Sequence, residues 1–254
     1  MELGLSGRVA VVGGASRGIG RATARALAAE GCRLVLAARG EDELESFAAE
    51  LASRGAQALP VAVDLTSQTG PQRLIDSALA RFGAVDVLVN NVGGSSGSSF
   101  EANELADFEQ GFARNFWPAL KTSQAALPAL ERAQGTIVHV ASIWGREAGG
   151  LVAYNVAKAA LVSLTKAMGR ELAAKGVRCV AVAPGSVLHP GGSWERRLQA
   201  DPEGITAWMK REIPAGRFGS AEEVANVIAF LASPRAAWVN ASVVVVDGGQ
   251  SRMF

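Results

Sequence analysis

Short apolar runs and longer amphipathic stretches alternate along the 254-residue chain. The apolar runs are rich in valine, leucine and isoleucine, and they are short, as strands buried on both faces of a sheet are. The stretches between them carry apolar residues at helical spacing, and several of them end in glycine. We expect strands at 8–12, 33–38, 58–63, 85–90, 136–141, 178–183 and 242–247.

This alternation predicts an α/β protein with a single domain at 1–254. Strand and helix in repeated succession are typical of a doubly wound Rossmann fold, here with a seven-stranded parallel sheet flanked by helices on both faces. One stretch, 188–215, interrupts the pattern with proline, glycine and two tryptophans. We call it the lid segment and predict a substrate-binding lid, with a surface excursion of one or two helices as the alternative.

Composition and charge narrow the class of protein. Hydrophobic residues make up 49% of the chain and charged residues 19%, which favours a large core over disorder. A net charge of +1 does not favour nucleic acid or an anionic membrane surface as a partner. Without an apolar run of membrane-spanning length or a signal-peptide pattern, a cytoplasmic protein is expected. Two distant cysteines and two histidines argue against disulfides and a metal site.

A glycine-rich turn, "VVGGASRGIGRATARAL", follows the first expected strand and leads into an amphipathic stretch. Gly14, Gly18 and Gly20 permit positive φ and the close approach of a pyrophosphate to free N–H groups at a helix N-terminus. Their spacing, GxxxGxG, differs from the GxGxxG of the general dinucleotide fingerprint, so their position between strand and helix carries the interpretation. A turn of purely structural use is the alternative.

The end of the second expected strand, "LVLAARGEDEL", indicates which nucleotide binds. NAD-selective folds place an acid there, about 20 residues after the glycines, to hold the ribose 2′-hydroxyl. Here Ala38 is followed by Arg39, which together with Arg17 is expected to bind a 2′-phosphate through charge-assisted hydrogen bonds. We therefore expect NADP(H), with NAD(H) as the alternative cofactor and two solvated surface arginines as the competing interpretation.

The segment "LVAYNVAKAAL" holds the only tyrosine of the chain, Tyr154, and Lys158 four residues later. On a helix at 151–175 the two side chains share one face, and a nearby ammonium lowers a phenol pKa that is ordinarily near 10. Ser142 follows an expected strand, so its hydroxyl is expected at the carboxyl edge of the sheet, where ligands bind in open α/β folds. Each residue alone is more often core or surface, but together they indicate acid–base chemistry.

The chain resembles a classical short-chain dehydrogenase/reductase over essentially its full length. Within that family it is most similar to bacterial 3-oxoacyl-acyl-carrier-protein reductases and related ketone reductases. The motifs stand in the family's order: "GGASRGIG", "VDL" at 63–65, "NNVG" at 90–93, Asn115, Ser142, "YNVAK", "PGSV" at 184–187 and "VDGG" near the end.

The resemblance implies a role for each matching residue. Tyr154 is the acid that protonates a carbonyl oxygen and the base in the reverse direction, and Ser142 hydrogen-bonds the same oxygen. Lys158 lowers the tyrosine pKa and binds the nicotinamide ribose, and Asn115 holds a water behind it. The cofactor is contacted by Tyr154 and Lys158 and by Gly14, Ser16, Arg17, Gly18, Ile19, Gly20, Arg39, Asp64, Leu65, Asn91, Gly93, Pro184 and Gly185, with no metal.

Several positions depart from the family pattern. Gly13 stands where a threonine commonly precedes the glycine turn, and Val92 replaces an alanine beside the cofactor. His189 stands where a threonine often contacts the nicotinamide carboxamide. Either its imidazole takes over that bond or the loop is arranged differently.

The implied activity is the interconversion of a ketone and a secondary alcohol by hydride transfer. Acidic and basic residues interleave in the lid segment, which favours a small free ketone over a carrier-bound acyl thioester as substrate. A polyol, sugar or hydroxysteroid dehydrogenase is the alternative. A nucleotide-binding sensor is disfavoured because it has no need of the Ser-Tyr-Lys set. The pocket is expected to involve Trp144 and the segment after Gly185, with Trp194, Trp208 or Met209 from the lid segment. The resemblance implies a homotetramer, formed partly through the helices at 103–133 and 151–175 and the last strand.

Overall fold

A seven-stranded parallel sheet forms the centre of the molecule, in the strand order β3-β2-β1-β4-β5-β6-β9. The computed structural model describes residues 2–253. The expected fold class is confirmed, and the sheet strands lie within one or two residues of the expected runs. The strands are β1 (Val9–Gly13), β2 (Arg33–Ala38), β3 (Ala58–Ala62), β4 (Val87–Asn90), β5 (Thr136–Val140), β6 (Arg178–Pro184) and β9 (Val243–Val246).

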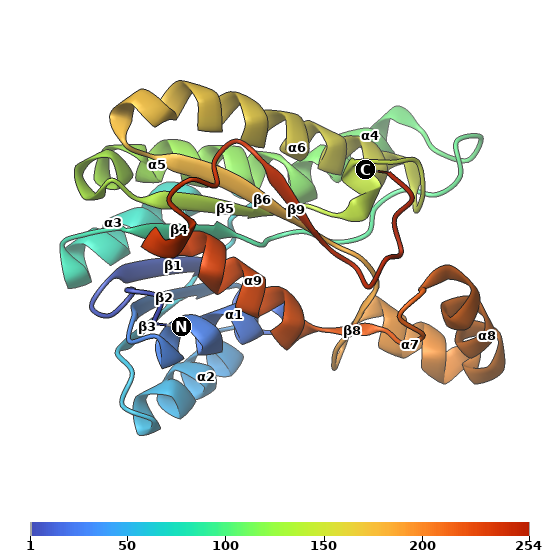
Figure 1. Cartoon of the computed structure of the whole chain (residues 1–254), viewed down its shortest axis with the longest axis horizontal. Coiled ribbons are helices and arrows are strands. Elements are labelled where there is room, and N and C mark those ends of the chain that lie inside the picture. Colours follow the sequence, from blue (N-terminus) through green and yellow to red (C-terminus); the bar gives the residue numbers. More distant parts are fainter. Residues whose placement is uncertain (1, 254) are drawn as a thin grey trace.

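Helices cover both faces of the sheet (Figure 1). One face carries α1 (Gly18–Ala29), α2 (Glu41–Ser53) and α9 (Ala221–Ala232), and the other carries α3 (Gly70–Phe82), α5 (Trp117–Ala133) and α6 (Val152–Leu172). Helix α4 (Leu105–Asn115) packs against α5 and α6. Single turns of 3-10 helix lie at Ile143–Gly145, Ala173–Lys175 and Pro234–Ala236.

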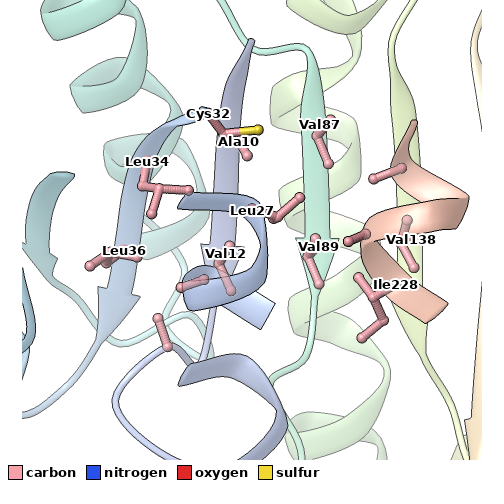
Figure 2. Close-up of a cluster of buried hydrophobic side chains, with 14 of the residues drawn as sticks. Ala10, Val12, Leu27, Cys32, Leu34, Leu36, Val87, Val89, Val138 and Ile228 are labelled. Atoms are coloured by element: carbon pink, nitrogen blue, oxygen red, sulfur yellow. The ribbon is translucent and has the colours of Figure 1, made fainter. Parts of the chain in front are cut away.

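Successive residues of each central strand belong to different cores. Ala10 and Val12 of β1 pack on the side of α1 and α9, together with Leu27 and Ile228 of those helices (Figure 2). Val9 and Val11 point the opposite way, toward α3 and α5. Because side chains alternate between the faces of a strand and both faces are covered, each strand is apolar throughout, which explains the uninterrupted apolar runs of the sequence.

The helix expected at 103–133 is two helices, because α4 ends at Asn115 and α5 begins at Trp117. Pro118 in the first turn of α5 explains the break: proline has no N–H to donate and fits best at a helix start. The helix expected at 151–175 is found as α6 followed by one 3-10 turn, which ends at Gly176 with a left-handed φ of 75°.

The lid segment forms two helices, α7 (Ser193–Ala200) and α8 (Pro202–Glu212), that project from the body (Figure 1). A short parallel pair, β7 (Val187–Leu188) and β8 (Gly219–Ser220), joins it to the sheet domain. Trp194 stacks on Trp208 with ring centroids 4.4 Å apart, and Phe218 packs 5.2 Å from Trp194. Aromatic packing therefore holds the two helices to each other and to the strand that follows them.

Cys32 and Cys179 are both free and buried, and burial raises the pKa of each thiol to about 12. Among residues 2–253, no group of three or more histidine, cysteine, aspartate or glutamate residues is placed to hold a metal ion. No helix in the same range has both the length and the apolar character needed to cross a membrane.

The turn between β1 and α1 tolerates no side chain at Gly20, because a Cβ there would overlap the carbonyl oxygen of Gly14. We expect Gly20→Ala to lower the free energy of unfolding by roughly 1–3 kcal/mol through this overlap. Gly40→Ala is the control: Gly40 has φ −79° and the added Cβ would meet only Glu43 Oε2 at 3.7 Å. Urea unfolding followed by tryptophan fluorescence compares the two, and equal stabilities would contradict the overlap.

Candidate active site

A cleft of about 960 Å³ opens at the carboxyl edge of the sheet, between the strand ends and the lid segment. Its lining runs from Arg39, after β2, past the turn at Gly18 to Tyr154 on α6. All the predicted site residues line it except Gly20 and Asn115. A smaller hollow of about 580 Å³ lies elsewhere, beside Asp86 and Gln134, and none of the predicted site residues lines it.

The glycine turn presents free backbone donors to this cleft. Helix α1 begins at Gly18, and its N-cap residue Arg17 makes no side-chain hydrogen bond to the first turn. The first N–H groups therefore remain available to an anion. Asn91 holds the turn from beneath, because its Nδ2 donates to the carbonyls of Gly13 and Gly14 at 3.3 and 3.1 Å.

Two departures from the family pattern, Gly13 and Val92, lie beside this turn. A Cβ on Gly13 would meet Leu65 Cδ1 at 3.1 Å and Val92 Cγ2 at 3.5 Å. A side chain on Gly13 would therefore crowd Leu65, whereas its Cβ would be in ordinary van der Waals contact with Val92. Neither substitution could be interpreted from the sequence, because the two residues are 79 positions apart in the chain.

Arg39 and Arg17 both line the cleft. The charge of Arg39 helps lower the pKa of Asp64, after the larger effect of the backbone and hydroxyl hydrogen bonds that Thr66 donates to this carboxylate at 2.9 and 2.7 Å. The side chain of Arg17 points toward the lid segment. Its Nη1 lies 3.9 Å from the position that a Cβ would take if Gly191 carried a side chain. The expected pairing of the two arginines around one phosphate stays a prediction.

Ser142, Tyr154 and Lys158 come together at the nicotinamide end predicted for the cleft. Ser142 lies just after β5 and accepts a hydrogen bond from Trp144 N at 3.2 Å. Lys158 is 3% exposed, and its Nζ lies 5.8 Å from the centroid of the Tyr154 ring. The helical spacing and the strand end thus place the three side chains in one site, as expected.

The pKa values of this set differ from the expectation. Burial raises the pKa of Tyr154, and a hydrogen bond with Ser142 offsets part of the rise. Burial also lowers the pKa of Lys158 to about 8, and its ammonium donates to the carbonyl of Val140 at 2.7 Å. The expectation of a lowered tyrosine pKa is wrong, because desolvation by burial outweighs the opposing hydrogen bond with Ser142.

Asn115 does not line the cleft but supports a loop of its wall through hydrogen bonds to Gly94. Its Oδ1 accepts from Gly94 N, and its Nδ2 donates to the carbonyls of Gly94 and Gly111, all at 3.0 Å. A Cβ on Gly93 would lie 2.7 Å from this Oδ1 and 3.3 Å from Lys158 Nζ. Asn115, the last residue of α4, therefore holds the loop at Gly93 and Gly94 beside Lys158. Its expected role in holding a water stays a prediction.

A buried polar chain behind the site was missed by the sequence analysis. Asn90 Nδ2 donates to Ser123 Oγ at 3.0 Å, and Ser123 lies 3.4 Å from His139 Nε2. His139 Nδ1 lies 2.9 Å from Thr165 Oγ1, whose hydroxyl donates to the carbonyl of Leu161. These bonds suit a neutral ring with the proton on Nδ1. The signal in the sequence was a histidine inside the apolar run "TIVHVA".

Aromatic residues contribute less to the cleft wall than expected. Trp194 lines the cleft, but Trp208 stacks behind it, and neither Trp208 nor Met209 is part of the wall. Trp144 is not part of it either, because its ring packs against Gly149 and Gly150. Polar residues outside the predicted set of site residues also line the cleft: Glu43, Ser95, Gln110, Arg114, His189 and Arg196.

Comparisons with known proteins agree with this geometry. The family model described as enoyl-(acyl carrier protein) reductase matches residues 14–251. The chain is 36% identical to 1,6-dihydroxycyclohexa-2,4-diene-1-carboxylate dehydrogenase of Acinetobacter baylyi, with 95% of each chain covered. It is 34% identical to 3-oxoacyl-acyl-carrier-protein reductase of Aquifex aeolicus, with 98% of this chain and 99% of that protein covered.

A solved structure supports the same assignment. L-sorbose reductase from Gluconobacter frateurii, crystallised with NADPH and L-sorbose, superposes with a TM-score of 0.94 at 32% identity and full coverage of both chains. The chain belongs to the short-chain dehydrogenase/reductase family, which confirms the resemblance read from its motifs. It is therefore an oxidoreductase that acts on a CH–OH group.

The neutral state of His139 predicts a pH dependence of stability. Burial, with a smaller effect of the Lys158 charge, lowers the pKa of His139 to about 3. An unfolded histidine binds a proton below about pH 6.5, whereas the folded one stays neutral, so stability falls as the pH falls from about 6.5 toward 3. The loss is at most about 1.4 kcal/mol per pH unit.

His139→Asn keeps a polar group near Thr165 and removes this titration. The unfolding free energies of the wild type and this variant are measured by urea unfolding at pH 7.5, 5.5 and 4.5. As the pH falls, the stability of the variant relative to the wild type should rise. A difference that does not change with pH would contradict the neutral, buried histidine.

Proposed function

We propose that the protein interconverts a ketone and a secondary alcohol, with NADP(H) as the preferred cofactor. The observation that carries the proposal is the meeting of Ser142, Tyr154 and Lys158 in the same cleft as the uncapped N-terminus of α1. A sensor without catalysis would need the nucleotide turn alone. The presence of both features in one cleft favours an enzyme that binds a dinucleotide and reacts beside its far end.

The residues of the cleft fit a nicotinamide dinucleotide. The free N–H groups at Gly18 and Ile19 suit the pyrophosphate, and Asp64 and Leu65 lie where an adenine would sit. Pro184 and Gly185 form the wall at the other end. When bound, the nicotinamide donates or accepts the hydride, and the protein orients the reactants and handles the proton.

Tyr154 carries the proton in this proposal. Because burial raises its pKa, the phenol is protonated at neutral pH and can donate to the oxygen of a bound carbonyl. The Ser142 hydroxyl is placed to hydrogen-bond the same oxygen as its charge develops. Lys158 adds a buried cation, held by the carbonyl of Val140, that favours negative charge on the phenol after the transfer. The same residues act in reverse during oxidation.

The preference for NADP(H) rests on Arg39. No acid stands at the end of β2, and Arg39 lines the cleft directly after that strand. Glu43 also lines the cleft nearby, and its carboxylate would repel a 2′-phosphate. NAD(H) therefore remains the alternative, while the NADPH complex of the similar L-sorbose reductase supports our choice.

The cleft wall supports a small carbonyl compound as substrate, with a 3-oxoacyl thioester as the larger option. Trp194 offers an apolar surface, whereas Ser95, Gln110 and Arg196 offer polar contacts. These polar groups favour a second candidate, a sugar or polyol substrate, which the likeness to L-sorbose reductase also supports.

A homotetramer and a cytoplasmic location complete the proposal. Exposed apolar side chains gather on the helices expected to mediate assembly: Leu105 on α4 is 75% exposed, Trp117 on α5 42% and Val156 on α6 40%. Burial of such residues against another copy would remove them from water.

Tyr154→Phe removes the proton donor and keeps the ring. We expect the turnover number for ketone reduction to fall at least about 100-fold, because acid catalysis is worth that much or more. The dissociation constant of NADPH, measured by fluorescence titration, should change less than about two-fold. Substantial remaining turnover would overturn the assignment of Tyr154, and failure of the wild type to bind either cofactor would overturn the proposed function.

Arg39→Asp reverses the charge beside the expected 2′-phosphate. The ratio of kcat/KM for NADPH to that for NADH should fall by about 10-fold or more, the value of a charge-assisted hydrogen bond. Arg73→Asp, an equal change of charge at an exposed position of α3 outside the cleft, is the control and should leave the ratio unchanged. An equal ratio in all three proteins would remove the argument for NADP(H).

A further inference from the structure

His189 reaches across the cleft to the N-terminus of α1. It lies in the loop between β7 and α7, and its ring packs on Gly18, 171 residues earlier in the chain. A Cβ on Gly18 would lie 2.9 Å from both Cε1 and Nε2 of the imidazole. Of the two arrangements left open by the sequence, the ring therefore takes a position over the glycine turn.

Two arginines accompany the imidazole there. Arg17, the N-cap of α1, places Nη1 3.9 Å from a Cβ position on Gly191. Arg196, on α7, donates from Nη1 to the carbonyl of Gly191 at 2.8 Å, and both arginines line the cleft. Basic groups from the turn and from the lid segment thus line the same cleft as the free N–H groups of α1, where they would help to stabilise an anion with two charges.

The lid segment holds the imidazole in place through its own backbone. Gly192 N donates to the carbonyl of His189 at 3.0 Å, and Gly191 N donates to Glu195 Oε2 at 2.7 Å. Gly191 has φ +69°, a left-handed conformation that favours glycine and lets the loop turn back on itself. The ring position is therefore a property of this folded loop.

The contacts of the ring decide its chemistry. His189 Nδ1 lies 3.0 Å from the carbonyl of Pro190, and a carbonyl oxygen only accepts, so Nδ1 carries a proton. The other nitrogen, Nε2, lies near the glycine turn. Phosphate oxygens also accept, so a hydrogen bond between Nε2 and a phosphate requires the doubly protonated imidazolium.

We propose that His189 is a ligand of the cofactor pyrophosphate, so that the lid segment completes the phosphate site that the glycine turn begins. This inference rests on the proposed function, because it requires a dinucleotide in the cleft. Binding of the pyrophosphate takes up a proton at Nε2. The charged groups on the elements around the ring are Arg17 at the start of α1 and Glu195 and Arg196 from α7.

Three ligands distinguish binding of the pyrophosphate from binding of the other parts of the cofactor. NADP+ contains both the pyrophosphate and the nicotinamide, 2′-phospho-ADP-ribose contains the pyrophosphate without the nicotinamide, and adenosine 2′-monophosphate contains neither of the two. Isothermal titration at pH 6 should show that His189→Gln weakens binding of the first two by the same factor, about 10-fold for a charged hydrogen bond. Binding of adenosine 2′-monophosphate should not change. Arg211→Gln, an exposed change on α8 outside the cleft, is the control and should bind all three as the wild type does.

The proton provides a second readout that does not depend on activity. Between pH 5.5 and 8.5 the affinity of the wild type for 2′-phospho-ADP-ribose should fall more steeply than that of His189→Gln, because imidazole groups lose their proton in this range. The 13C resonance of Cε1 should move toward the imidazolium position when this ligand is added at pH 7. The assignment is simple, since burial lowers the pKa of the only other histidine, His139, to about 3.

Each result decides between distinct conclusions. Weaker binding of NADP+ without weaker binding of 2′-phospho-ADP-ribose would place His189 at the nicotinamide and overturn the proposal. Unchanged affinity of His189→Gln for both, or an unmoved Cε1 resonance, would also overturn it. If the wild type binds none of the three ligands or NAD+, the proposed function fails and the inference fails with it.

Discussion

The parallel direction of the seven strands is the constraint on which this molecule depends. In such a sheet every strand delivers its last residue to the same edge, and every following loop begins there. The glycine turn after β1, Arg39 after β2, Asn91 after β4 and Ser142 after β5 are therefore neighbours in space although they are spread over more than 120 residues. The cleft is a consequence of strand direction before any particular side chain is considered.

Buried polar groups join this cleft to the core of the protein. Lys158 has its ammonium in a low-dielectric region and binds the carbonyl of Val140, next to the neutral His139. A buried polar group is tolerated only when its hydrogen bonds are satisfied, so the chain from Asn90 to Thr165 constrains β4, β5, α5 and α6 together. Helix α6, which carries Tyr154 and Lys158, is thus tied to β4, β5 and α5 by buried hydrogen bonds.

The lid segment differs from the rest in how it is held. Its helices α7 and α8 have no fully buried residue, and they depend on the stacking of Trp194 and Trp208 and on the short β7–β8 pair. Contact between His189 and Gly18 connects it to the glycine turn. If the pyrophosphate binds between His189 and the glycine turn, the bound cofactor helps to attach the lid segment to the body of the protein. The substrate side of the cleft then takes its shape after the cofactor is bound.

The sequence by itself determined the strands, most helices, the class of fold and the residues around the cleft, because apolar periodicity and glycine placement are local signals. It did not reveal that Gly13 lies against Leu65 and Val92 or that Arg17 reaches toward Gly191, since each contact depends on residues distant in the chain. The pKa of Tyr154 was misjudged for the same reason: helical spacing reports a nearby lysine, whereas burial, which only the tertiary structure decides, sets the larger effect.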